Sequence, residues 1–137
     1  MIRAAVAAVL FSACGHPAPA PRGPGPAKSV QLNAPGEVID LAPALVPGYV
    51  TVVDFWSASC GACTVVGGML AVQTAHDDGV VIRKVDVGDG MTPVARAYEI
   101  GALPHYNIYD KRRRLRHVLV GNDCLKAPEL ARQLVAE

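Results

Sequence analysis

The stretch Tyr49–Cys63, YVTVVDFWSASCGAC, joins a nearly continuous apolar run to a pair of cysteines. Residues 49–56 are β-branched and aromatic, which predicts a strand buried on both faces. Cys60 and Cys63 follow this strand, at the start of a predicted helix over 60–76. Gly67 and Gly68 weaken that helix by about 1 kcal/mol each relative to alanine. The two cysteines could form a structural disulfide, half of a metal site or a redox-active pair.

The remaining pattern alternates strands with helices. Thr92 is a suitable N-cap, and Pro93 follows it at the first helical position. Residues 41–48 leave room for only a short first helix. The other predicted elements are a strand at 80–87, a strand at 104–110 with a hairpin partner at 114–120, and a closing helix at 126–137. This order indicates an α/β sheet with helices on both faces.

The position of Cys60 favours redox chemistry. At a helix N-terminus its sulfur lies beside unpaired backbone amides and the positive end of the helix dipole, which stabilise a thiolate. Cys63 follows one turn later on the same helix face, so it can close a disulfide with Cys60 or attack a mixed disulfide formed there. Gly61 and Ala62 are small and leave the approach open.

The other two interpretations have less support. A zinc site needs two further ligands, and residues 31–137 offer only Cys124 and the scattered His76, His105 and His117, without a second paired spacing. A structural disulfide that closes so short a loop restrains the unfolded chain very little. We therefore prefer a redox-active pair and leave the other two open.

Three motifs together resemble the thioredoxin family. VVDFWSASCGAC, residues 52–63, is similar to the family's active-site segment, and GALPHYNIYD, residues 101–110, to its cis-proline loop. VIRKVDV, residues 81–87, resembles the intervening strand with its lysine. The resemblance covers about residues 36–137. It implies a thioredoxin-like fold, with a central mixed β-sheet flanked by helices on both faces, and thiol–disulfide oxidoreductase activity without metal or organic cofactor.

The resemblance also implies residue roles. Cys60 is the expected attacking thiol, and Cys63 the buried resolving thiol of the same redox-active disulfide. Asp54 is the expected proton-transfer carboxylate, which fits the cost of burying a carboxylate without a partner or a task. Lys84 matches the lysine that supports this proton transfer, and Trp56 is expected to pack beside the active site.

A second group of residues is expected to contact substrate. Pro104 matches the cis-proline, and the backbone of Leu103 is expected to pair with an extended substrate segment. Gly61 and Ala62 lie between the two cysteines. His105 is expected to tune the thiolate or contact substrate, although a loop histidine facing solvent is an equally good interpretation.

The sequence departs from the family pattern at three positions. Ala62 replaces the usual proline between the cysteines, Ser59 replaces the usual tryptophan before them, and Gly68 stands where a kinking proline is common. Residues between the cysteines tune the thiol pKa and the reduction potential. The Asp-Phe-Trp context resembles the reducing members, so we expect a reductase of protein disulfides. The alternative function is a non-catalytic peptide-binding or metal-delivery module.

The N-terminus resembles an export signal. Residues 1–14 carry Arg3, an apolar run and then LFSAC, which resembles the lipobox of bacterial lipoproteins and implies lipidation of Cys14. A plain signal peptide is the alternative. Residues 15–30 are rich in proline and glycine and predict a linker, and residues 31–137 form the predicted thioredoxin-like domain. We therefore expect a lipid-anchored, periplasm-facing protein of the bacterial cell envelope.

Composition limits the partners. The net charge of +1 and the seven aromatic residues argue against nucleic-acid binding. The basic run over 111–116 predicts a solvated hairpin or a contact with anionic lipid headgroups. We expect a monomer that uses protein disulfides or dithiols as substrates and needs a separate redox partner. Cys124 predicts a buried structural thiol rather than a reactive one.

Overall fold

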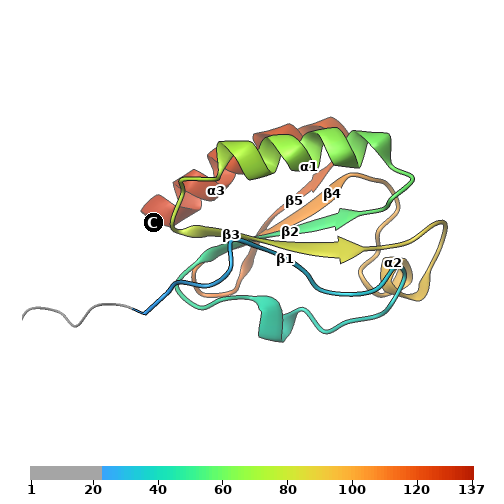
Figure 1. Ribbon diagram of the computed structural model, residues 1–137, viewed down its shortest axis with the longest axis horizontal. Coiled ribbons are helices and arrows are strands. Elements are labelled where there is room, and N and C mark those ends of the chain that lie inside the picture. Colours follow the sequence, from blue (N-terminus) through green and yellow to red (C-terminus); the bar gives the residue numbers. More distant parts are fainter. Residues whose placement is uncertain (1–22) are drawn as a thin grey trace, which may run out of the picture.

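The computed structural model describes residues 23–137, so the predicted signal peptide, Cys14 and the first part of the linker lie outside the described residues. The elements follow the predicted alternation of strands and helices (Figure 1). They are β1 (Ser29–Gln31), the 3₁₀ turn η1 (Ala42–Ala44), β2 (Val50–Trp56), α1 (Gly61–Gln73), β3 (Val80–Asp86), α2 (Pro93–Ala97), β4 (His105–Tyr109), β5 (Leu115–Val120), the 3₁₀ turn η2 (Gly121–Lys126) and α3 (Ala127–Ala136).

Five strands form one mixed sheet in the order β1-β3-β2-β4-β5. β3 runs parallel to β1 and β2, whereas β4 runs antiparallel to β2 and β5. Figure 1 shows α1 and α3 together on one face of the sheet, with η1 and α2 on the other. The predicted sheet with helices on both faces is therefore confirmed.

Each face of the sheet has its own hydrophobic core. On the α1 face, Val52 and Tyr106 pack with Leu70 of α1 and Leu134 of α3. In the opposite core, Phe55 packs with residues around η1 and on α2, among them Leu41, Leu45, Val94 and Ala95. β2 contributes to both cores, as its apolar run predicted.

The structure refines several predicted boundaries. α1 ends at Gln73, three residues before the predicted end, and the side chain of Thr74 then donates to the carbonyl of Leu70. Thr92 caps α2 as predicted, since its hydroxyl accepts from the amide of Ala95 at 3.4 Å. β1 takes in Ser29 and Val30, which the sequence placed in the linker. A strand of three residues is too short for a recognisable alternation pattern.

No helix within residues 23–137 has both the length and the apolar character required to cross a membrane.

The α1 face allows a matched test of core packing. Leu70 is 2% exposed and Val72, two residues later, is 76% exposed. Leu70→Ala should lower the free energy of unfolding by about 2–5 kcal/mol, because a buried leucine leaves a cavity. Val72→Ala should change it by less than about 0.5 kcal/mol. Urea unfolding of the oxidised protein measures both, and equal losses would contradict the packing described here.

Candidate active site

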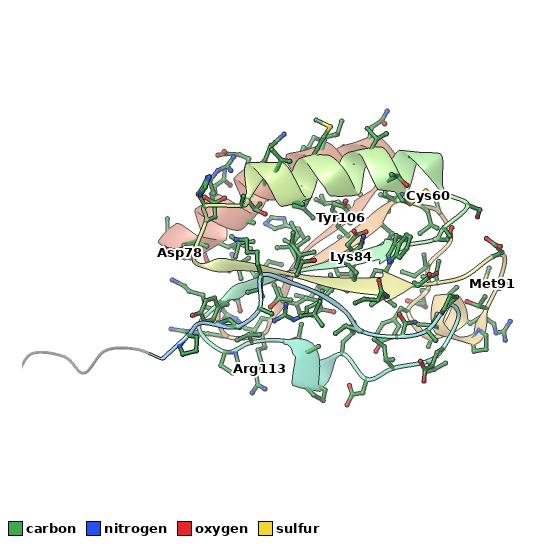
Figure 2. The ribbon with its side chains drawn as sticks, in the orientation of Figure 1. Cys60, Asp78, Lys84, Met91, Tyr106 and Arg113 are labelled. Carbon is green, nitrogen blue, oxygen red and sulfur yellow. A yellow bond between two sulfur atoms is a disulfide. The ribbon has the colours of Figure 1, made fainter. Side chains whose placement is uncertain are left out.

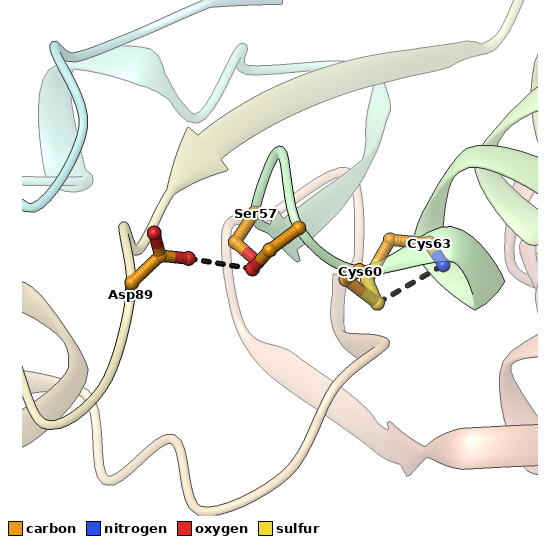
Figure 3. The surroundings of a disulfide bond; sticks show 5 residues. Ser57, Cys60, Cys63 and Asp89 are labelled. Atoms are coloured by element: carbon orange, nitrogen blue, oxygen red, sulfur yellow. Dashed lines mark hydrogen bonds between the residues drawn. A yellow bond between two sulfur atoms is a disulfide. The ribbon is translucent and has the colours of Figure 1, made fainter.

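Cys60 and Cys63 are joined by a disulfide at the start of α1 (Figure 3). Their Cα atoms lie 5.3 Å apart. Cys60 is the N-cap of the helix, and its sulfur accepts a hydrogen bond from the amide of Cys63 at 3.1 Å. Cys60 is half-buried, whereas Cys63 is only 3% exposed. A substrate can therefore reach the first sulfur more readily than the second, and the helix N-terminus stabilises a thiolate at that first position.

Asp54 lies in the core beneath α1. It is 2% exposed, and Oδ1 has no hydrogen-bond partner among the described residues. Burial raises the pKa of this carboxyl to about 6, while the charge of Lys84 opposes the rise. A Cβ placed on Gly67 would lie 3.3 Å from Asp54 Oδ2. Gly67 stands one turn after Cys63 on the same helix face, so the carboxyl lies close to the buried thiol's side of α1.

Lys84 and Trp56 form a pair next to Asp54. Lys84 lies opposite Asp54 in the parallel ladder between β2 and β3. Its Nζ sits 4.4 Å from the centroid of the Trp56 ring, a cation–π distance. The indole nitrogen of Trp56 donates to Gln31 Oε1 at 3.0 Å. These contacts hold the lysine charge on the Asp54 side of the sheet, where it favours the ionised carboxyl.

A groove of about 520 Å³ opens beside Cys60. Its walls include Ser59, Asp89, Met91 and Leu103. The Leu103–Pro104 peptide bond is cis, as the resemblance implied. Gly61 and Ala62 are exposed at the edge of the helix and leave the disulfide accessible. The arrangement can accept an extended peptide beside the reactive sulfur.

Two serines and an aspartate border this groove (Figure 3). The hydroxyl of Ser59 donates to Asp89 Oδ1 at 2.5 Å, and it lies 3.2 Å from the hydroxyl of Ser57. The family pattern has a large aromatic side chain where Ser59 stands, so this chain has a polar rim there. The sequence analysis missed Asp89. Its only signal was a polar Gly-Asp-Gly turn directly after a buried strand.

His105 does not lie at the surface near Cys60. Its side chain is 7% exposed, its ring packs edge-on against Phe55 at 5.6 Å, and Nε2 lies 3.1 Å from Asn107 Oδ1. Burial lowers the pKa of this imidazole. The reason is register: His105 lies opposite Phe55, so its side chain enters the core on the α2 face. The structure thus buries the imidazole, so a loop histidine that faces solvent was the wrong interpretation.

Cys124 is a buried thiol. It is 1% exposed, and its sulfur donates to the carbonyl of Leu119 at 3.4 Å. Burial raises the pKa of this thiol to about 11, so it remains protonated and poorly nucleophilic. Within residues 23–137, no three histidine, cysteine, aspartate or glutamate side chains come together in a way that could hold a metal ion.

The basic run forms the turn between β4 and β5. Asp110 organises it, because its carboxylate accepts from the amides of Arg112 and Arg114 and pairs with the Arg114 guanidinium at 2.7 Å. These hydrogen bonds hold the pKa of Asp110 well below its usual range. Arg116 pairs with Glu137 at 2.7 Å. Part of the basic run is therefore neutralised within the chain.

The raised pKa of Asp54 predicts a pH-dependent stability. Folding raises this pKa from 3.8 to about 6, so the folded state binds the proton more tightly than the unfolded state. The free energy of unfolding should therefore fall as the pH rises from about 4 to about 6, and then stay level. Asp54→Asn removes this loss and should stabilise the oxidised protein at pH 8 by up to about 3 kcal/mol.

Urea unfolding at pH 4 and pH 8 measures this difference. At pH 4 the variant and the parent should be nearly equal. Asp123→Asn, at a side chain 62% exposed, is the matched control and should show little change at either pH. A destabilised Asp54→Asn protein at pH 8 would show that burial does not raise the pKa of this carboxyl.

Comparison with known proteins gives a consistent result. The family model for thioredoxin matches residues 46–133. The chain is 33% identical to the thioredoxin of Mycoplasma pneumoniae over 70 residues, which is 51% of this chain and 67% of that protein. The fold is similar to reduced Schistosoma mansoni thioredoxin pre-protein, with a TM-score of 0.62 and 23% identity over 79% of this chain and 99% of the other.

Two further solved structures share the fold. A thioredoxin variant from Halobacterium salinarum superposes with a TM-score of 0.65 and 18% identity over 83% of this chain and 96% of that chain. Thioredoxin f2, solved in a complex with ferredoxin:thioredoxin reductase, gives a TM-score of 0.60 and 21% identity. The match covers 77% of this chain and 96% of the other. With the family model covering most of the folded residues, the chain belongs to the thioredoxin family, and Cys60 and Cys63 are the redox-active pair of a thiol–disulfide oxidoreductase.

Proposed function

We propose that this protein reduces protein disulfides in the bacterial cell envelope. The full proposal is a monomer that is anchored by a lipid on Cys14 and faces the periplasm. It works through the Cys60–Cys63 dithiol without an organic cofactor, and a separate redox partner resets it.

The observation that carries the proposed reaction is the buried carboxyl of Asp54. With a pKa of about 6 it is ionised at neutral pH, and it lies beneath α1 on the side of Cys63. It can therefore accept the proton of the buried thiol and favour the thiolate that resolves a mixed disulfide. The Asp-Phe-Trp context at residues 54–56, which resembles the reducing members of the family, supports the reductase direction.

The groove beside Cys60 supports a peptide as the substrate. The backbone next to the cis-proline can pair with an extended chain, and Met91 and Leu103 offer apolar contacts while Asp89 is acidic. A disulfide in a flexible or unfolded segment fits this groove better than one in a compact core. The similarity to thioredoxin f2, which was solved with a reductase, supports a reductase as the resetting partner.

The envelope location is supported by the sequence of the N-terminus alone. The apolar run and LFSAC precede a proline- and glycine-rich segment that could separate a lipid anchor from the folded domain.

A redox titration tests the reductase proposal. The full chain carrying Cys14→Ser and Cys124→Ala is equilibrated with defined thiol–disulfide buffers, and the state of the Cys60–Cys63 pair is read by the mass added on alkylation. We expect a reversible midpoint near about −270 mV, which is typical of a reductant, and not near about −120 mV. Cys63→Ser should accumulate a mixed disulfide with a peptide substrate, whereas Cys60→Ser should form none.

Three results would overturn the proposal. A midpoint near the oxidising value would make the protein a donor of disulfides. A pair that fails to cycle, combined with peptide binding retained by Cys60→Ser, would favour the non-catalytic binding module. Stoichiometric copper or zinc after purification would favour metal delivery.

The location is tested separately. The full chain, expressed in a bacterial host, should partition with membranes and incorporate a labelled fatty acid. The variant Cys14→Ser should lose the label and should not be processed at that residue. Equal labelling of the two proteins, or a parent that stays in the cytoplasmic fraction, would contradict the lipid anchor.

A further inference from the structure

Two buried oxygen atoms near the active site lack hydrogen-bond partners. They are Asp54 Oδ1 and the hydroxyl of Tyr106, the two such side-chain atoms among residues 23–137. Tyr106 is fully buried, and Figure 2 shows it directly beneath α1. An unpaired buried polar atom costs free energy, so two of them in one place need a physical explanation.

The two side chains are neighbours. Asp54 of β2 lies opposite Tyr106 of β4 in the antiparallel ladder, so both project from the same face of the sheet. Gly67 of α1 covers both. A Cβ on Gly67 would lie 3.3 Å from Asp54 Oδ2 and 3.9 Å from the Tyr106 hydroxyl. The Tyr106 hydroxyl and one carboxylate oxygen of Asp54, Oδ2, are thus within 4 Å of one point, where Gly67 has no side chain.

We propose that the Tyr106 hydroxyl is a positioning residue for proton transfer, which donates to one buried water molecule bridging it to the Asp54 carboxylate under Gly67. One carboxylate oxygen and one hydroxyl give this water the two polar partners that a buried water needs. The Tyr106 hydroxyl gains an acceptor, and the Asp54 carboxylate gains a donor, from the same molecule.

The direction of the hydrogen bond follows from the chemistry of the phenol. Burial raises the pKa of Tyr106 above its ordinary value, and the charge of Asp54 raises it further, so the hydroxyl keeps its proton and donates. A donor stabilises the ionised carboxyl. Tyr106 would therefore oppose the desolvation that raises the pKa of Asp54.

Other groups also face Asp54 from the elements around it. Lys84 lies on β3 and lowers its pKa. Cys63 lies on the buried side of α1, and Cys124 of η2 is a protonated thiol. α3 contributes only apolar groups to this core, because its charged side chains Glu129 and Arg132 are exposed. Among these groups, Tyr106 is the hydroxyl donor on the strand next to Asp54.

The consequence concerns the resolving step of the reaction. The Asp54 carboxylate takes the proton of the Cys63 thiol, and the resulting thiolate attacks Cys60 in the mixed disulfide. The Cys60–Cys63 bond forms as the bond to substrate breaks, and the substrate sulfur leaves as a thiolate that water protonates. The dithiol loses two electrons and the substrate disulfide gains them. Tyr106 and its water set the pH at which Asp54 can accept the proton.

The test follows the Asp54 carboxyl directly. Its pKa is measured in the full-length oxidised protein by carbon NMR with labelled aspartate, where no substrate is needed. Tyr106→Phe should raise this pKa by about one unit, because the carboxylate loses a hydrogen-bond donor. Tyr109→Phe is the matched control, since it removes a hydroxyl from the same strand on the opposite face and should leave the pKa unchanged. An unchanged pKa in Tyr106→Phe would overturn the proposal.

A second pair of variants avoids any change in β4. Gly67→Ala places a methyl group between the two oxygens and should raise the pKa of Asp54 in the same direction. Gly68→Ala is its control, because a Cβ there meets nothing within 4 Å while the gain in helix propensity is the same. Equal pKa values in these two variants would contradict a bridging water under Gly67.

Kinetics then separate a positioning role from a structural one. The rate to measure is the single-turnover resolution of a peptide mixed disulfide on Cys60. Tyr106→Phe should shift the acidic limb of its pH–rate profile to higher pH by about one unit, with little change in the rate at pH values well above that limb. In an Asp54→Asn background the same change should shift nothing. A uniform loss of rate at every pH would mean that Tyr106 is only structural. If the protein reduces no protein disulfide, the proposed function fails while the NMR titration still decides the role of Tyr106.

Discussion

The burial of β2 on both faces is the constraint on which the rest of the structure depends. Its apolar residues supply both hydrophobic cores, and its two edges pair with β3 and β4. The strand is enclosed on all sides up to Trp56. The chain leaves the sheet after this residue, and α1 begins at Gly61. The reactive cysteine is held at this junction by the geometry of the core.

The same burial creates the chemistry of Asp54. A carboxyl in the middle of an enclosed strand loses solvation, which raises its pKa towards the range where it can exchange protons near neutral pH. Burying this carboxylate costs folding free energy, because its charge loses solvation. An alanine or asparagine at position 54 would carry no charge to desolvate. The charge of Lys84 on β3 lowers the pKa of Asp54, and Tyr106 lies next to Asp54 on β4, so both groups lie where they can moderate that cost.

The surface around the disulfide is where this chain differs from the family pattern. With Ser59 in place of a large aromatic residue, the rim of the groove carries a hydrogen bond from Ser59 to Asp89. This polar, acidic rim lies next to Cys60 but is separate from the start of α1, which stabilises a thiolate at that sulfur.

The sequence by itself determined the α/β class, the order of the main elements and the cysteine pair, because apolar periodicity and residue spacing are local properties of the chain. The role of Asp54 was implied by the resemblance to the thioredoxin family and stays a prediction. The short β1, the end of α1 and the five-residue α2 were decided by tertiary packing, since segments this short carry too little pattern. Side-chain neighbours also came only from the structure. Strand register turned His105 into the core opposite Phe55 and set Tyr106 beside Asp54, and register depends on how two distant strands align.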